Sequence, residues 1–411
     1  MNRPTGMKAF TVLWLGQAVS LLGSAMTWFA FTIWAWEKTG QPSALSTISF
    51  FAFLPGVLLA PLAGAFVDRW NRKLVMLLSD LGAAAGTLAA FLLLLAGRLE
   101  IWHIYVIGIL SGFFTAFQYP AFNAAVGVML PKEQFARAQA MMGLSYALSG
   151  ILAPVFAAAL LGRIGFAGIM TIDLLTFLAA FLTLAWIRVP QPVATPVGLA
   201  SRGSVWSETR FGFRYIRERS SLLSLAALFM AANAFLAIGA TLIAPLILSG
   251  TGNSEPALAT VQSAGAVGGV VGGGILGVWG GPKRRIHGIL LSGAGACLLG
   301  VVGLGLSRAL LYWAVGSFFF SFFEPFVEGI NLALWQTKVE ADVQGRVFSA
   351  RKLLVEIPYL LGIFVAGPLA EAWSISGMMT LAGLCGTFTF AAGFFSRSVR
   401  AAESLLPDRQ E

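Results

Sequence analysis

Charged residues are scarce in this chain. Only 11% of its 411 residues are Asp, Glu, Lys or Arg, whereas 57% are hydrophobic. A water-soluble protein carries about 25% charged residues, and a single soluble core stops growing at roughly 250–300 residues. This much apolar sequence therefore cannot be buried in water. The composition excludes a soluble enzyme, a nucleic-acid-binding domain and a disordered chain.

Histidine and cysteine are also scarce, with two residues of each type. Both cysteines, Cys297 and Cys385, lie in apolar segments, where a free thiol behaves as a small hydrophobic group. No spacing of Cys and His predicts a disulfide framework or a metal site, and the sequence has no phosphate-binding loop. We therefore expect no metal, no cofactor, no nucleotide-driven step and no enzymatic activity.

Long hydrophobic runs are what the sequence does contain. Twelve segments are long and apolar enough to cross a bilayer, for which a helix needs roughly 20 residues. Continuous runs also disfavour an outer-membrane barrel, whose strands are short and alternate apolar with polar residues. The sequence predicts an all-α integral membrane protein with 12 transmembrane helices. The stretch from Arg188 to Ser221 divides them six plus six, and its basic, amphipathic part predicts a helix at the membrane surface.

The basic residues predict the orientation. With the N-terminus inside, all but four of the 27 Lys and Arg residues fall on the cytoplasmic side. This distribution is typical of a multi-pass protein of the inner or plasma membrane with both termini in the cytoplasm. We expect an N-terminal six-helix bundle at 1–188, a cytoplasmic linker with an amphipathic helix at 189–221, and a C-terminal six-helix bundle at 222–411.

Short matches recur between the two halves. Asn123 at the end of the fourth span corresponds to Asn331 at the end of the tenth, and Pro154 in the fifth corresponds to Pro368 in the eleventh. The offsets are close to one another, which favours a duplicated six-helix unit. Such repeats form secondary transporters, in which the substrate site lies between the repeats near the middle of the bilayer.

The loop after the second span carries a distinctive pattern, formed by Gly64, Asp68, Arg69, Arg72 and Lys73. It resembles the signature loop of the major facilitator superfamily. Together with the twelve spans and the repeat, the resemblance covers nearly the whole chain. It implies a conformational gate, in which Asp68 accepts charge-assisted hydrogen bonds and latches the cytoplasmic side shut in one state. An alternative is that the basic residues only set the orientation.

Two positions and one span depart from the usual family pattern. Asn71 stands where the family usually has glycine, and asparagine is the next best residue for a left-handed turn. In the second half Gly281 replaces the aspartate, so that copy keeps only its basic charges. The fifth span keeps Pro154 among small residues, as in the drug antiporters, but several of the usual glycines are alanine or serine.

At finer detail the sequence resembles the macrolide-efflux and enterobactin-exporter branch of the drug:proton antiporters. Besides the signature loop, the matching segments are Ile172-Asp173 with Thr176-Phe177, 212–216 and 345–348. The resemblance implies export of amphipathic, drug- or macrolide-like molecules by proton antiport with alternating access. Alternatives are an exporter of siderophores or other metabolites and a non-transporting membrane sensor. The partners it implies are a small-molecule substrate, protons and the bilayer; we expect a monomer that binds no nucleic acid.

Five acidic residues fall within the predicted spans: Asp80, Asp173, Glu324, Glu328 and Glu356. Each costs about 2.5–3.5 kcal/mol on insertion scales, so a function is the first hypothesis. Glu324, Glu328, Glu356 and Asp173 are the candidates for proton coupling. The alternatives are structural ion pairs for the two glutamates of the tenth span and a structural hydrogen-bonding role for Asp173. We expect Asp80 to belong to the network of the basic loop.

Polar and aromatic residues recur at helical spacing on the first, fourth, seventh and tenth spans, which line the central cavity in this superfamily. On the tenth span the polar residues from Ser317 to Asn331 follow at intervals of 4, 3, 4 and 3 and share one helical face. The candidates for the substrate cavity are Gln17, Ser24, Thr27, Trp28, Phe31, Thr115, Gln118, Tyr119, Asn233, Ser321 and Asn331. Hydroxyls, amides and rings suit bulky amphipathic substrates better than sugars or phosphates.

Overall fold

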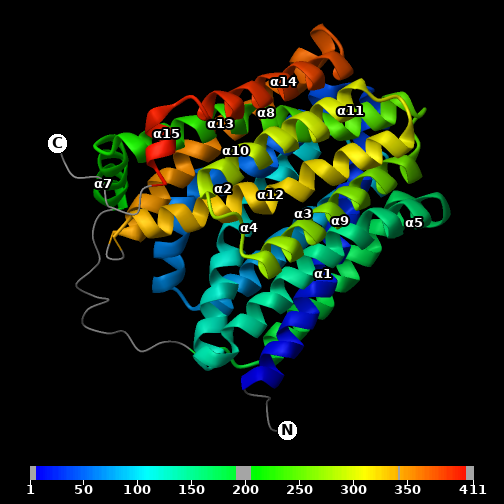
Figure 1. The fold of residues 1–411 in the computed structure, drawn as a ribbon. Helices are drawn as coiled ribbons and strands as arrows, with labels where there is room; N and C mark the ends of the chain where they lie inside the picture. The colour runs from blue at the N-terminus through cyan, green and yellow to red at the C-terminus, as the bar shows by residue number, and fades with distance from the viewer. Residues whose placement is uncertain (1–5, 191–204, 341–342, 404–411) are drawn as a thin grey trace. The chain divides into compact units, whose positions relative to one another are not determined.

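The computed structural model describes residues 6–190, 205–340 and 343–403, and this part of the chain is helical, without strands (Figure 1). Eleven of the helices found in it are long and apolar enough to cross a membrane. One of them, α5 (Phe135–Trp186), contains two spans, because Gly165 interrupts it with φ 63° and ψ −176°. Only glycine adopts this backbone conformation readily. The predicted all-α architecture of twelve spans is confirmed.

The helices group into two compact units. The first holds residues up to Lys38 and from Phe51 to Val205, and the second holds Thr39–Phe50 and the chain from Trp206 onward. The helices of the first unit are α1 (Gly6–Thr39), most of α2 (Pro42–Arg69), α3 (Arg72–Leu95), α4 (Ile101–Met129), the short η1 (Lys132–Gln134) and α5. Those of the second are α7 (Val205–Arg217), α8 (Ser220–Gly250), α9 (Glu255–Trp279), α10 (Arg285–Gly295), the π-helical η2 (Ala296–Val302), α11 (Gly303–Leu306), α12 (Leu310–Lys338), α13 (Gln344–Ala372), α14 (Ile375–Gly393) and α15 (Arg397–Ala401).

The first turns of α2 pack within the second unit, against α13. The backbone N–H of Ser43 donates a hydrogen bond of 2.8 Å to the Glu371 carboxylate, which satisfies one of the N–H groups left free at a helix start. Gly367 has no room for a side chain, because Ser43 lies directly against it. The rings of Phe50 and Phe364 are 4.9 Å apart. The beginning of α2 is therefore fixed to the end of α13.

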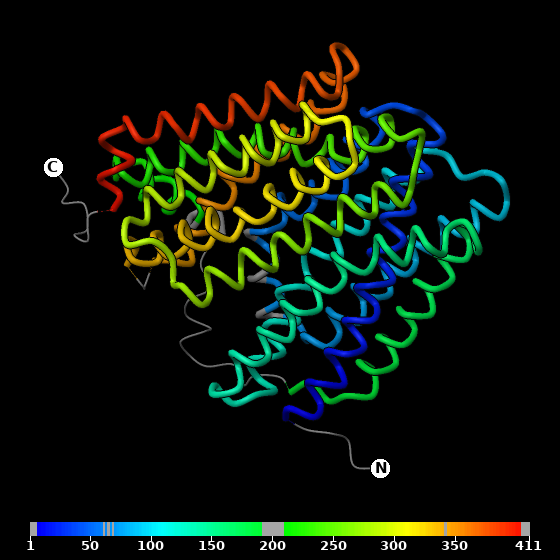
Figure 2. Tube along the Cα trace, turned by 45° about the vertical axis from the view of Figure 1, so that its right-hand side comes forward, coloured from blue at the N-terminus to red at the C-terminus, as the bar shows by residue number. Residues whose placement is uncertain are grey.

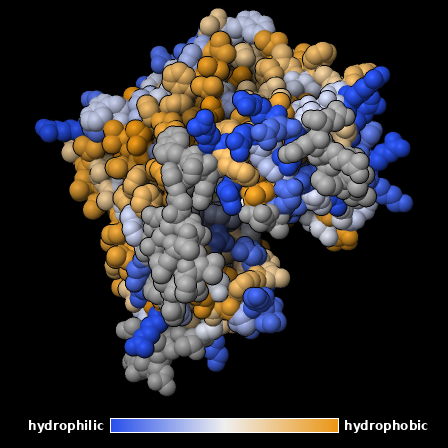
Figure 3. All heavy atoms as spheres, turned by 90° about the vertical axis from the view of Figure 1, so that its left-hand side faces the viewer, coloured by the Kyte–Doolittle hydropathy of each residue, from blue (hydrophilic) through white to orange (hydrophobic). Residues whose placement is uncertain are grey.

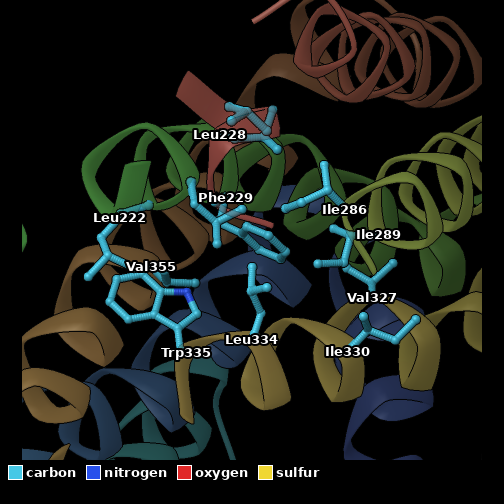
Figure 4. Packing of buried hydrophobic residues seen from close by; sticks show 14 of the residues in the cluster. Leu222, Leu228, Phe229, Ile286, Ile289, Val327, Ile330, Leu334, Trp335 and Val355 are labelled. Carbon is cyan, nitrogen blue, oxygen red and sulfur yellow. The ribbon is translucent and has the colours of Figure 1, made fainter. Parts of the chain in front are cut away.

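The core of the second unit gathers side chains from α8, α10, α12 and α13. Figure 4 shows Phe229, Ile289, Leu334 and Trp335 pointing toward one another, and all four are buried. Tyr215 and Ile216 of α7 belong to the same cluster. The helix of the central linker is therefore part of the packed core of the second unit.

A polar contact at its end holds α7 in place. The Tyr215 hydroxyl donates a hydrogen bond of 2.8 Å to Glu340, and the Arg219 guanidinium lies 3.4 Å from the centre of the tyrosine ring. Burial, assisted by the hydrogen bond to Glu340, raises the pKa of Tyr215 to about 12, so the phenol remains a donor. Gly212 allows α7 to approach the main chain of Arg346 on α13.

Helices α9 and α12 run side by side (Figures 1 and 2). Gly268 and Gly272 face the main-chain oxygens of Phe318 and Phe322, and a Cβ atom at either glycine would overlap with them. Small residues of this kind let transmembrane helices approach closely.

Large apolar side chains cover much of the outer surface. Leu58, Leu95 and Leu175 are each more than half exposed. Figure 3 shows hydrophobic side chains over much of the side on which α7 lies, with hydrophilic ones gathered in separate patches. Exposed apolar surface of this extent is expected of a protein that faces lipid.

The contact between α9 and α12 gives a test of the packing. We expect Gly268→Ala to lower the stability of the purified protein by about 1–3 kcal/mol, because the added methyl group overpacks the interface. Gly274→Ala on the same helix is the matched control, since nothing lies within 4 Å of its Cβ position. Thermal unfolding in detergent, followed by tryptophan fluorescence, measures both. Equal midpoints for the two variants would contradict this packing.

Candidate functional site

Asp173 is the most deeply buried carboxylate among the described residues, with 1% of its surface exposed. Ser24 on α1 donates a hydrogen bond of 3.0 Å to its Oδ1 atom, and Thr87 on α3 donates one of 3.1 Å to Oδ2. Gly23 brings α1 directly against the main chain of Asp173. Thr27 faces the same carboxylate, but its buried hydroxyl makes no hydrogen bond of good geometry. This carboxylate therefore joins α1, α3 and α5 through hydroxyl groups.

Asp80 is the second buried carboxylate of the first unit, with 6% of its surface exposed. Gln17 on α1 donates a hydrogen bond of 2.9 Å to Oδ2, and Gln118 on α4 donates one of 2.9 Å to Oδ1. Gln118 also donates a bond of 3.1 Å to the Gln17 side-chain oxygen. The three side chains form a closed triangle between α1, α3 and α4, which we call the Asp80 triangle.

The two buried carboxylates follow a common spacing. Gln17 and Ser24 are seven residues apart on α1, as are Asp80 and Thr87 on α3. Seven residues of helix correspond to about 10.5 Å, so the two sites lie at successive levels along the same pair of helices. Polar residues spaced seven apart on both the first and the third span are the signal in the sequence that could have predicted that Asp80 and Thr87 lie beside Gln17 and Ser24.

The basic residues of the signature loop contact main-chain carbonyls. Arg72 donates a hydrogen bond of 2.9 Å to Ala124 on α4. Lys73 donates bonds of 2.8 and 2.6 Å to Ala185 and Ile187 at the end of α5. At the end of α5, the cation of Lys73 satisfies free carbonyls and interacts well with the helix dipole. The loop thus ties α3 to the ends of α4 and α5, while Asp80 is held by glutamines and not by this loop.

Asn71 begins α3. Its backbone is extended, with φ −66° and ψ 110°, and its side chain accepts a hydrogen bond from the N–H of Leu74. The expected left-handed turn is therefore wrong at this position, because asparagine is equally suited to cap a helix start. Gly64, Asp68 and Arg69 lie in α2, but their side-chain positions lie outside the described residues, so the latch stays a prediction.

The two glutamates of α12 have different surroundings. Glu328 accepts a hydrogen bond of 3.2 Å from Arg351 on α13, and the Arg351 guanidinium also lies 5.5 Å from the ring of Trp335. Glu324, one turn earlier, makes no hydrogen bond or ion pair within the described ranges, and its side chain is exposed. Of the pair, Glu328 is therefore the one held in an ion pair among the described residues.

Glu356 and Asn331 complete the polar groups of this part of the second unit. Glu356 is half-buried and lies 3.6 Å from Lys352, one turn earlier on α13. Asn331 is completely buried, and neither its amide oxygen nor its nitrogen has a hydrogen-bond partner in the described part of the chain. Asn233 on α8 donates a hydrogen bond of 3.4 Å to the main chain of Val355.

The cavity candidates differ in accessibility. Thr115 and Tyr119 are exposed; Gln17, Ser24, Trp28, Gln118, Asn233 and Ser321 are half-buried; Thr27, Phe31 and Asn331 are buried. The structure brings Gln17 together with Gln118, and Trp28 together with Phe31, whose ring centres are 5.7 Å apart. Ser321 lies on the side of α12 that faces Gly265 of α9. Across the described residues no three His, Cys, Asp or Glu side chains are grouped to hold a metal ion.

Comparisons with known proteins agree with this architecture. The chain is 29% identical over 386 residues to macrolide efflux protein A of Streptococcus pyogenes, covering 91% of this chain and 92% of that protein. It is 23% identical over 384 residues to the multidrug efflux pump Tap of Mycolicibacterium fortuitum, covering 89% and 88%.

Solved structures show the same fold at low identity. A bacterial homologue of the iron transporter ferroportin, in its inward-facing state, matches with a TM-score of 0.69 at 16% identity, covering 95% of this chain and 99% of that one. The POT family transporter PepTSo matches with a TM-score of 0.72 at 13% identity, covering 97% and 99%. The sequence pattern of the Major Facilitator Superfamily matches residues 13–362. The chain therefore belongs to the Major Facilitator Superfamily, a family of membrane transporters.

Proposed function

We propose that this transporter exports amphipathic, macrolide-like small molecules by proton antiport. The observation that carries the proposal is the similarity to macrolide efflux protein A, which extends over 91% of the chain. The chemistry of the candidate cavity residues supports it. They supply hydroxyls, amides and aromatic rings but few charges, a lining suited to bulky molecules with scattered polar groups.

Carboxyl groups in the spans support coupling to protons. A charged group within the bilayer is expensive and is commonly retained for a function. Glu324 is the first candidate, because it lacks an ion-pair partner in the part of the chain described. Asp173 is the second, because the hydrogen bonds to its carboxylate come from hydroxyl groups and it has no basic partner among the described residues. Glu328 and Glu356 have basic neighbours, Arg351 and Lys352, and rank below these two.

Alternating access supplies the transport cycle in this proposal. We place the protein in the cell membrane as a monomer with both termini in the cytoplasm, because the basic residues cluster in the loops on one side. Asp68 in the signature loop biases the equilibrium between the two access states, and Arg72 and Lys73 fix the loop to the ends of α4 and α5.

The first test concerns direction and energy. Everted membrane vesicles containing the protein are energised and offered a panel of macrolides and cationic dyes. We expect accumulation inside the vesicles that collapses when an uncoupler is added, because the proton gradient drives export. Vesicles without the protein are the control. Accumulation that requires ATP and persists with the uncoupler would contradict the proposal.

The second test concerns the gate. We expect Asp68→Asn to slow transport about 5- to 150-fold, which corresponds to a change of about 1–3 kcal/mol in the balance of states. Substrate binding to the purified protein should change little, because Asp68 does not contact substrate. Glu133→Gln, which removes the charge of an exposed carboxylate on η1, is the matched control. Turnover of Asp68→Asn equal to that of the unmodified protein would refute the latch.

The third test separates the two glutamates of α12. We expect Glu324→Gln, which mimics the protonated carboxyl, to abolish gradient-driven efflux and to preserve gradient-independent exchange of substrate. Glu328→Gln should have a milder effect, because its carboxylate is already paired with Arg351. Both activities are measured with labelled substrate in the same vesicles. Full efflux by Glu324→Gln together with none by Glu356→Gln would move the coupling site to α13.

A further inference from the structure

We infer that the Asp80 triangle is a proton-binding site inside the first unit, and that a bound proton changes the contact between α1 and α4. The inference deepens the proposed function and rests on proton coupling for its biological role. The site is separate from Glu324, Glu328, Glu356 and Asp173, the carboxyls assigned above to coupling. Its chemistry is carried by Asp80 together with the two glutamines that hold it.

The first step of the argument is the direction of the hydrogen bonds. Both carboxylate oxygens of Asp80 accept a bond of 2.9 Å, one from each glutamine amide. The reverse orientation of either amide would place its oxygen against a carboxylate oxygen, so these bonds define which end of each amide faces Asp80. The arrangement found in the structure is therefore the one that suits the deprotonated carboxylate.

The second step is the missing counter-charge. Asp80 forms no ion pair and no further hydrogen bond within residues 6–190, 205–340 and 343–403. The ionisable side chains on the helices α1, α3, α4 and α5 around it are Lys8, Glu37, Lys38, Arg72, Lys73, His103, Tyr105, Tyr119, Arg137, Tyr146, Arg163 and Asp173. Asp80 forms no hydrogen bond or ion pair with any of them. A buried carboxylate without a basic partner is costly, whereas the neutral acid is not, so the site favours exchange between the two forms.

The third step is the choice of glutamine as the partner. Lys and Arg can only donate hydrogen bonds, but an amide has both a donor and an acceptor end. The Oε1 atom of Gln118 is buried and has no partner in the described part of the chain. When Asp80 gains a proton, one of its oxygens becomes a donor, and a rotation of the Gln118 amide supplies the acceptor. The triangle can therefore hold either form of the carboxyl.

The fourth step is the effect on the helices. A proton added at a free lone pair of Asp80 creates a buried O–H donor that needs an acceptor, and the unpartnered Oε1 atom of Gln118 can serve as one after the amide rotates. Rotation of the Gln118 amide removes its bond of 3.1 Å to the Gln17 oxygen, a polar contact that joins α4 to α1 in addition to the ring contact of Phe10 with Phe122. The proton enters and leaves as H⁺ at a carboxylate oxygen, and no other covalent bond changes. Proton binding is thereby coupled to the contact between two spans of the first unit.

The alternative is that the triangle is only structural and Asp80 never changes its protonation. Infrared difference spectroscopy of the full-length protein in lipid nanodiscs distinguishes the two by comparing low and high pH. We expect a carboxylic-acid C=O band in the unmodified protein that Asp80→Asn lacks and that Asp173→Asn, the matched control, retains. A spectrum of Asp80→Asn that superimposes on that of the unmodified protein would overturn the inference.

A second variant keeps the test independent of the folding of Asp80→Asn. Gln118→Met retains the carboxyl but removes the amide, so the Asp80 band should persist at a shifted frequency. An unshifted band would refute the role of Gln118. Because no substrate is added, this result is independent of efflux. If the unmodified protein shows the Asp80 band but no proton-driven efflux, the proposed function is refuted and the proton site is not.

Discussion

The need to neutralise or pair polar groups inside an apolar environment governs this structure. Hydrophobic helices can be placed in many arrangements, but each buried polar atom requires a specific neighbour. In the first unit the carboxylates of Asp80 on α3 and Asp173 on α5 meet this requirement with amides and hydroxyls from α1, α3 and α4. The polar contacts thus determine which helices of the first unit are neighbours and at what level along their length they meet.

In the second unit two carboxylates are paired with basic residues, and two of the helices pack closely through glycines. Glu328 and Glu356 lie beside Arg351 and Lys352, while glycines of α9 let its backbone approach α12. The two halves thus differ in the partners of their carboxylates: neutral amides and hydroxyls in the first, and basic side chains in the second. Among the described residues, the first unit has buried carboxyls without basic partners, whereas the second pairs Glu328 and Glu356 with basic residues and leaves Glu324 unpaired. This asymmetry directs attention to the first unit as a place where protons can be stored.

The architecture could be predicted from the sequence, because long apolar runs and the distribution of basic residues are local signals. The helix break at Gly165 falls between the predicted fifth and sixth spans, because the end of one apolar run and the start of the next are also local signals. The partners of Asp80 could not be predicted, since Gln17 and Gln118 are 63 and 38 residues away, and only the packing of three helices decides that they meet. The surroundings of Glu324 and Glu328 differ although they share one stripe, because the position of Arg351 depends on how α13 packs beside α12.

One helix belongs to both units. The beginning of α2, up to Phe50, packs with the second unit, and its remainder packs with the first. Just past this junction stands Pro55, which has no N–H to bond to the carbonyl of Phe51 one turn earlier. The helix therefore lacks one backbone hydrogen bond close to the residue at which it passes from one unit to the other. A missing backbone hydrogen bond makes a helix easier to bend, so Pro55 lowers the stiffness of α2 close to the residue at which the helix passes from the second unit to the first.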